Sequence, residues 1–165
     1  MSAVTAVLRR FSGERWLAGA IRALAGADRA LQLRTTGRAS LTAMAGLPAL
    51  LLTTTGRRSG QPRTVPLTFD GHGDGLLVVG SNFGQADHPA WSANLLARAE
   101  ATVTVRGAEW PVRARLLSDD EKAAVWPQLL RLWPGYAAYQ ERSGRNIRVF
   151  LLTPDRPPED GAADD

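Results

Sequence analysis

The sequence predicts a mainly β domain of the α+β class, in which about six mostly antiparallel strands form a small barrel with inserted helices. Between residues 47 and 154, short runs of β-branched and apolar residues alternate with turns that contain glycine. Helical periodicity interrupts these runs only briefly, and strands joined by tight turns favour a barrel over a doubly wound parallel sheet. The length of 165 residues fits one domain with one hydrophobic core.

Residues 1–46 are expected to form an N-terminal helix and a connector ahead of the domain at 47–154. Apolar residues recur at helical spacing over residues 3–33, with arginines between them. Such a basic amphipathic helix either packs against its own domain or makes peripheral contact with a membrane surface. The acidic, proline-containing residues 155–165 are expected to be a disordered tail.

Three strands are predicted to begin the barrel. β-rich runs at 49–55 and 63–69 flank a tight turn, so the pair is predicted to form a hairpin. Pro66 has no N–H to donate, which places the second strand at an edge or a bulge. Residues 70–75 are rich in glycine and turn the chain into a third strand at 76–80.

The later strands alternate with short helices. A helix is expected at 88–98, with a proline in its first turn. A second hairpin joins strands at 101–106 and 110–117 across Gly107, and the last strand is expected at 147–153.

A longer helix is predicted to follow the second hairpin. Ser118 and Glu121 have the spacing of a capping box, which marks the first turn of a helix. Pro127 is expected to kink or restart this helix, and a further turn or helix carries Tyr136 and Tyr139.

Composition excludes several kinds of chemistry. The chain has no cysteine, which removes disulfides and thiolate nucleophiles, and the two histidines, His72 and His88, leave few ligands for a metal, so no metal is expected. Its apolar runs are shorter than the roughly 20 residues that span a bilayer, and its start lacks a secretory signal, so we expect a cytoplasmic protein. A formal net charge of +4, with arginine as nearly all of the basic residues, favours an anionic ligand.

The densest functional signal is a hairpin tip in the run LLLTTTGRRSGQPRTVPL. Arg57, Arg58 and Arg63 lie within the span of one loop, and Gly56 and Gly60 let backbone N–H groups approach a ligand. This pattern favours a cradle for phosphate, and the alternative is a solvated turn whose arginines serve only solubility. The run lacks the Gly-Lys-Ser/Thr ending of a nucleoside triphosphate loop.

Two further runs have the residues to line a ligand. In GSNFGQADHPAWSANL, small polar residues enter a helix N-terminus where Trp91 and Asn94 share a face, and core packing is the alternative for Trp91. In WPGYAAYQ, the spacing of Trp133, Tyr136 and Tyr139 is typical of an aromatic wall around a planar ligand, or of a core stripe. With no convincing nucleophile, metal cluster or acid pair, these features favour a cofactor that brings its own reactivity.

These runs, the last one extended to EKAAVWPQLLRLWPGYAAYQERSGRNIRVFLLTP, resemble the deazaflavin-dependent nitroreductase family of actinobacteria over residues 47–154. The resemblance implies a split β-barrel that binds coenzyme F420, whose phosphate and glutamyl tail are anionic. It also implies an oxidoreductase that passes hydride from the reduced coenzyme, F420H2, to a planar electron-poor small molecule such as a quinone, an enone or a nitroaromatic. The alternatives are a split barrel that uses FMN and a non-catalytic module that binds membrane lipid or nucleic acid. Arginines clustered at a turn, without interleaved aromatics, favour a compact anion over nucleic acid.

The resemblance assigns roles to the residues at matching positions. The coenzyme would be bound by Arg57, Arg58, Ser59 and Arg63 at its phosphate, by the backbone of Thr64, Val65, Pro66 and Leu67, by the ring loop Val79, Gly80, Ser81 and Asn82, and by Ala90, Trp91 and Asn94 of the next helix. Tyr136 would be catalytic, giving a hydrogen bond or a proton to the acceptor, with Trp133 and Tyr139 beside it as the substrate-binding wall. Two positions depart from the family pattern, because Asn82 stands where Lys is common and Trp133 where nitroreductase-active relatives have Tyr.

Overall fold

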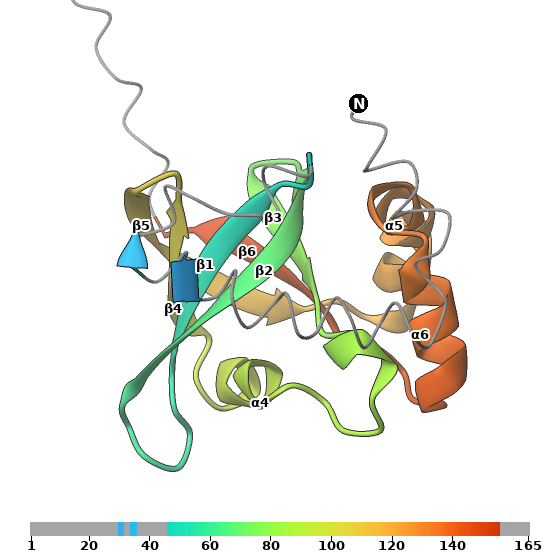
Figure 1. Ribbon diagram of the computed structural model, residues 1–165, viewed down its shortest axis with the longest axis horizontal. Helices are drawn as coiled ribbons and strands as arrows, with labels where there is room; N and C mark the ends of the chain where they lie inside the picture. Colours follow the sequence, from blue (N-terminus) through green and yellow to red (C-terminus); the bar gives the residue numbers. More distant parts are fainter. Residues whose placement is uncertain (1–29, 32–33, 36–45, 156–165) are drawn as a thin grey trace, which may run out of the picture.

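The computed structural model describes residues 30–31, 34–35 and 46–155, so the helix predicted over 3–33 and the tail predicted over 155–165 lie almost wholly outside the described residues. Within them, six strands form a closed barrel in the order β1-β2-β3-β6-β5-β4, with every neighbouring pair antiparallel (Figure 1). The strands are β1 (Ala49–Thr55), β2 (Pro62–His72), β3 (Gly75–Val79), β4 (Glu100–Val105), β5 (Ala108–Leu116) and β6 (Val149–Pro154). The helices are α4 (Ala90–Ala97), α5 (Asp119–Leu132), α6 (Gly135–Ser143) and the short 3₁₀ turn η1 (Asn82–Gly84).

The barrel interior is a hydrophobic core that α4 closes at one end (Figure 1). Leu50 and Leu52 of β1 and Val78 of β3 point inward and are almost completely buried, because alternate residues of a strand face the same side. Trp91 of α4 fills the end of the barrel and packs against Phe150, with 5.7 Å between the ring centroids. Helix α4 therefore covers this end of the barrel core.

A second core lies between the outside of the barrel and the helices α5 and α6. Leu77 and Val79 of β3 face away from the barrel interior and pack with Leu129 of α5 and Tyr139 of α6. Figure 1 shows these two helices together at one side of the barrel. Strand β3 is thus buried on both faces, which explains its continuous apolar sequence.

Strand β2 changes partner along its length. Residues Pro62–Thr68, which we call the outer half of β2, pair with β1, whereas Phe69–His72 pair with β3. Pro66 lies opposite Leu51, where no second described strand pairs with it, so the predicted edge position of Pro66 is confirmed.

Local signals located the start of α5 correctly but not its course. The Ser118 side chain accepts a hydrogen bond from the Glu121 N–H, and the Glu121 carboxylate accepts one from the Ser118 N–H, so the capping box is confirmed. The helix does not restart at Pro127 and continues to Leu132. The carbonyl that loses its partner there belongs to Ala123, on the exposed side of the helix, where water can replace the missing N–H.

Two loops differ from the prediction. The turn expected over 70–75 narrows to Gly73 and Asp74, because β2 continues to His72 in pairing with β3. The turn η1 was not predicted, since its backbone depends on contacts with α6 that are remote in sequence. No helix in the described part of the chain is long and apolar enough to cross a membrane.

The start of β3 gives a first test of the fold. A Cβ at Gly75 would lie 2.8 Å from the Leu152 carbonyl oxygen and 2.8 Å from Leu151 Cδ1, so Gly75→Ala must move β6. We expect it to lower the free energy of unfolding by about 1–3 kcal/mol in chemical denaturation, as overpacking does. The control is Gly71→Ala in the same hairpin, where nothing lies within 4 Å of the added Cβ and the change should stay under about 1 kcal/mol. Equal losses in the two variants would contradict the close packing of β3 on β6.

Candidate functional site

The hairpin tip between β1 and β2 is an ordered turn with exposed arginines. Gly56 N–H donates to the Gln61 carbonyl at 2.8 Å, and Gly60, which has a left-handed φ of +67°, donates to the Gly56 carbonyl at 2.7 Å. Ser59 Oγ accepts from the Gln61 N–H at 3.3 Å, so this hydroxyl also stabilises the turn. The predicted turn is therefore confirmed.

The arginines of the tip carry charge that no described residue neutralises. Arg57, Arg58 and Arg63 are exposed, and in the described part of the chain their guanidinium groups make no hydrogen bond or ion pair. Three unneutralised cations on one short turn attract an anion and can bond it with charge-assisted hydrogen bonds. The tip is an anion-binding candidate, as the sequence predicted.

Asn94 of α4 holds the tip in place. Its side-chain Oδ1 accepts from the Arg57 N–H at 3.1 Å, and its Nδ2 donates to Thr54 Oγ1 at 3.0 Å. The side chain is buried, with both ends of the amide in use. Asn94 therefore positions the start of the tip, and this is a different task from the direct coenzyme contact expected for it.

The other two predicted residues of α4 differ in exposure. Trp91 is 6% exposed inside the barrel core, which is the alternative that the sequence left open for it. Ala90 is exposed at the first position of the helix.

The outer half of β2 continues from the tip along the barrel. Its four predicted residues, Thr64, Val65, Pro66 and Leu67, are half-buried. Thr64 Oγ1 lies 2.8 Å from Thr53 Oγ1 in a hydrogen bond that ties the strand to β1. No second described strand pairs with Val65 or Leu67. The backbone along this half can therefore bond a ligand.

The predicted ring loop is buried at its first residues and open at its last. Val79 packs in the outer core, and Gly80 donates its N–H to the Arg148 carbonyl at 2.8 Å, so neither offers a side chain to solvent. Ser81 and Asn82 are half-buried, and Asn82 Nδ2 donates to the Asp87 carbonyl at 2.9 Å. Asn82 also has a positive φ of 47°, which Asn tolerates better than most residues.

Arg145 binds this loop, and it was not identified from the sequence as part of the site. It lies between α6 and β6, and its guanidinium donates to the backbone carbonyls of Gly80, Ser81 and Gln85 at 3.1, 2.6 and 3.1 Å. It also contacts His88 Nδ1 at 2.9 Å. No sequence signal separates Arg145 from the other arginines, because its acceptors are some sixty positions away in the chain.

The three predicted aromatic residues form a buried group that contacts the ring loop through Phe83 of η1. Trp133, Tyr136 and Tyr139 are all under 10% exposed, and the rings of Tyr136 and Tyr139 lie 6.5 Å apart edge to face. The ring of Phe83 in η1 meets Tyr139 at 6.4 Å, and Trp126 of α5 meets Tyr136 at 6.3 Å. The structure therefore joins the ring loop to the aromatic group.

The two tyrosine hydroxyls have unusual surroundings. Burial raises the pKa of Tyr136 well above its ordinary value, with smaller contributions from Tyr139 and the Asp70 carboxylate, so this hydroxyl stays protonated and able to donate. Burial also raises the pKa of Tyr139, whose Oη is fully buried without a hydrogen-bond partner in the described part of the chain. The Trp133 indole partly offsets that rise but does not reach hydrogen-bond geometry. A buried hydroxyl without a partner is a candidate to bond a ligand.

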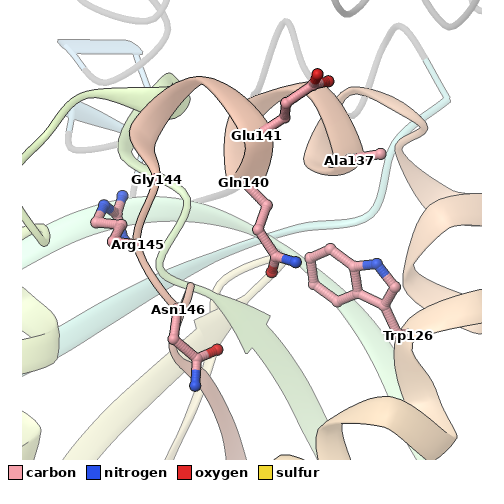
Figure 2. Close-up of a pocket in the computed structure, with 7 residues that line it drawn as sticks. All are labelled: Trp126, Ala137, Gln140, Glu141, Gly144, Arg145 and Asn146. Carbon is pink, nitrogen blue, oxygen red and sulfur yellow. The ribbon is translucent and has the colours of Figure 1, made fainter.

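A separate groove lies on the outer side of α5 and α6 (Figure 2). It has a volume of about 560 Å³ and contains none of the residues predicted to bind coenzyme or acceptor. Its lining residues are Trp126, Ala137, Gln140, Glu141, Gly144, Arg145 and Asn146. The described residues hold no cluster of three His, Asp or Glu side chains that could bind a metal.

Comparison with known proteins gives a consistent picture. The sequence model of the F420H(2)-dependent quinone reductase family matches residues 25–154. The F420H(2)-dependent quinone reductase Rv1261c of Mycobacterium tuberculosis is 35% identical over 114 residues, which cover 64% of this chain and 73% of that protein. Rv3178 of the same organism is 32% identical over 108 residues, which cover 66% of this chain and 91% of that protein.

A solved structure shows the same architecture. The F420-H2 dependent reductase FDR-A is 34% identical, with a TM-score of 0.58, over 64% of this chain and 93% of that chain. Together with the six-stranded closed barrel, this likeness confirms the predicted split β-barrel.

The bond between Asn94 and the tip can be tested on the free protein. Asn94→Ala leaves the Arg57 N–H without its partner and removes the donor to the Thr54 hydroxyl, which keeps only its 3.5 Å bond to the Arg63 carbonyl, so we expect a loss of about 1–3 kcal/mol in the free energy of unfolding. Proteolysis within residues 56–61 should also become faster. Leu96→Ala, on the exposed side of the same helix, is the control and should change neither quantity appreciably. An Asn94→Ala protein as stable as the Leu96→Ala protein would rule out the clamp.

Proposed function

The chain belongs to the F420H(2)-dependent quinone reductase family, and we propose that its hairpin tip, the outer half of β2 and the ring loop together hold the coenzyme against the buried aromatic group. It is an F420H2-dependent reductase with a quinone-type acceptor, as the sequence predicted. The FMN alternative is not needed. Membrane contact through residues 3–33 has no support in these comparisons.

The hairpin tip carries the proposal, because its charge fits the anionic end of the coenzyme. Arg57, Arg58 and Arg63 are exposed and have no acidic partner among the described residues. A phosphate placed there gains charge-assisted hydrogen bonds without breaking any that these side chains make to the described residues. We assign the phosphate to these three side chains and to Ser59.

The geometry between the tip and the aromatic group suits a long ligand. The tip is fastened by α4, whereas the ring loop is fastened by α6 and Arg145. The outer half of β2 leads away from the tip, and Val65 and Leu67 have no second strand partner among the described residues. We infer that the backbone there bonds the middle of the coenzyme.

When bound, the reduced coenzyme supplies the hydride, and the protein has two tasks around it. The first is to orient coenzyme and acceptor, which the rigid barrel and the anchored tip can do. The second is to assist the oxygen of the acceptor. The Tyr136 hydroxyl stays protonated because of its burial, so we assign it the hydrogen bond or proton that this oxygen needs.

Tyr139 and Trp133 are proposed to complete the acceptor site. The Tyr139 hydroxyl is buried without a partner in the described part of the chain, so a polar atom of the acceptor or coenzyme would satisfy it. Trp133 stands where nitroreductase-active relatives of the resembled family have Tyr, and it offers an indole in place of a phenol. A quinone is therefore our first choice of acceptor over a nitroaromatic.

Fluorescence titration with F420 tests the anchoring role. Arg58→Ala removes a charged donor from the tip, so we expect the Kd to rise about 10- to 100-fold, which corresponds to about 1.5–3 kcal/mol. Turnover at saturating coenzyme should change little. Arg131→Ala on the exposed side of α5 is the charge-matched control and should bind like the wild type. Equal weakening in both variants would mean that only net charge matters.

Reduction of a quinone by F420H2 tests the role of Tyr136. Tyr136→Phe should lower kcat by about 100-fold, the lower end for general acid catalysis, with less than a threefold change in the Kd of F420. Because burial raises the pKa of Tyr136, the wild-type rate should show no loss from tyrosine ionisation up to about pH 10. A Tyr136→Phe enzyme with normal kcat would remove the assignment.

A further inference from the structure

The loop between β3 and α4 has a backbone that does not maintain its shape unaided. Asn82, Phe83 and Gly84 are three consecutive residues with positive φ, at 47°, 54° and 74°. Residues other than glycine disfavour the left-handed region of backbone conformation, so this loop keeps its shape only where surrounding contacts enforce it. Two such contacts come from Tyr139, against the ring of Phe83 and the Cα side of Gly84.

Arg145 provides the largest set of contacts to this loop. Four of its five N–H groups are directed at the carbonyls of Gly80, Ser81 and Gln85 and at His88 Nδ1. These acceptors lie on both sides of η1, so one planar guanidinium closes the loop from end to end. An ammonium group could not satisfy four acceptors in this fork-shaped arrangement.

The charge of Arg145 is not neutralised by these bonds. Its acceptors are carbonyls and an imidazole, and no carboxylate lies within ion-pair distance of it among the described residues. Arg148, whose guanidinium bonds Ser92 Oγ at 3.2 Å, contributes a second cation nearby, and its effect on the pKa of Arg145 exceeds the opposite effect of the Asp87 carboxylate. Arg145 therefore places a fixed positive charge directly behind Gly80 and Ser81.

We propose that Arg145 is a positioning residue for the coenzyme, which shapes the 80–85 loop and gives it the positive charge that Asn82 lacks. The inference rests on the proposed function, because it takes this loop to contact the coenzyme ring. It adds a residue that lies within the last of the three sequence runs but to which the sequence assigned no role. It also explains how a chain with Asn in place of the usual Lys retains a cation at this loop.

His88 makes the arrangement sensitive to pH. Since an arginine only donates, His88 Nδ1 must accept, and the imidazole is neutral with its proton on Nε2. Burial, Arg148 and Arg145 all lower the pKa of His88, and Asp87 opposes them. The folded loop thus binds the neutral form, and protonation at acid pH replaces one hydrogen bond with a repulsion between two cations. Loop stability should fall as pH drops below the ordinary histidine pKa of about 6.5.

The experiment combines a readout of the loop with a readout of the coenzyme. Hydrogen exchange of residues 80–89 is followed by mass spectrometry in the free protein, and the Kd of F420 is measured by fluorescence. Arg145→Met should speed exchange in this loop at least tenfold while β4 and β5 exchange as in the wild type, and it should raise the Kd about tenfold. Arg131→Met removes an exposed arginine and is the control. Arg145→Lys retains the charge but has too few donors for the four acceptors, so residues 80–89 should still exchange faster than in the wild type.

Two outcomes would overturn the inference in distinguishable ways. If the wild type and Arg145→Met bind F420 equally, Arg145 has no positioning role although the proposed function stands. If the wild type itself does not bind F420, the proposed function fails and the positioning role fails with it.

The role of His88 is tested separately, by the pH dependence of loop exchange in the free protein. His88→Gln is the comparison variant, because Gln retains a hydrogen-bond acceptor that does not titrate. Loop exchange in that variant, corrected for the intrinsic rate, should not accelerate between pH 7 and pH 5 as it does in the wild type, and equal acceleration in both would contradict the role of His88.

Discussion

The change of partner along β2 is the constraint on which the rest of the structure depends. Strand β2 pairs with β1 over Pro62–Thr68 and with β3 over Phe69–His72, so the two pairings do not overlap along the strand. The barrel is closed by the pairing of β1 with β4, and the outer half of β2 is left with one strand partner in the described part of the chain. The hairpin tip then projects at the end where α4 fills the barrel (Figure 1). The proposed coenzyme site follows directly from this pairing.

Both ends of that site are held by neutral groups, which leaves the charges available. The amide of Asn94 fixes the tip, and backbone carbonyls receive Arg145 behind the ring loop. Had carboxylates held these positions, they would have neutralised the cations that an anionic ligand needs. The carboxylates that form ion pairs among the described residues, Glu100, Glu121 and Asp155, bind Arg113 and Arg115 and not the arginines of the tip.

The features that sequence predicted well are those set by neighbouring residues. The bounds of β1, the capping box of Ser118 and the hairpin tip depend on local composition and turn chemistry. The resemblance to a family added the prediction of the coenzyme. Three runs of residues in the same order as in the family carry more information than the spacing of charges alone. Contacts between residues distant in sequence were missed, as for the bonds of Arg145 to the 80–85 loop and of the Asn94 amide to the tip. The ambiguity of Trp91 between core and ligand was likewise decided only by the way α4 packs.

Lys122 has a consequence for a protein that handles quinones, which are electrophiles that add to amines and thiols. The chain has no thiol, and Lys122 is its single lysine. That amine donates to Gln140 and Asn146 and lies 5.0 Å from the centre of the Trp126 ring, so these neighbours restrict the approach of an electrophile to it. All the other Lys or Arg positions are arginine, so the side chains offer one primary amine and no thiol to a quinone. A quinone therefore finds few side chains in this sequence to which it could add.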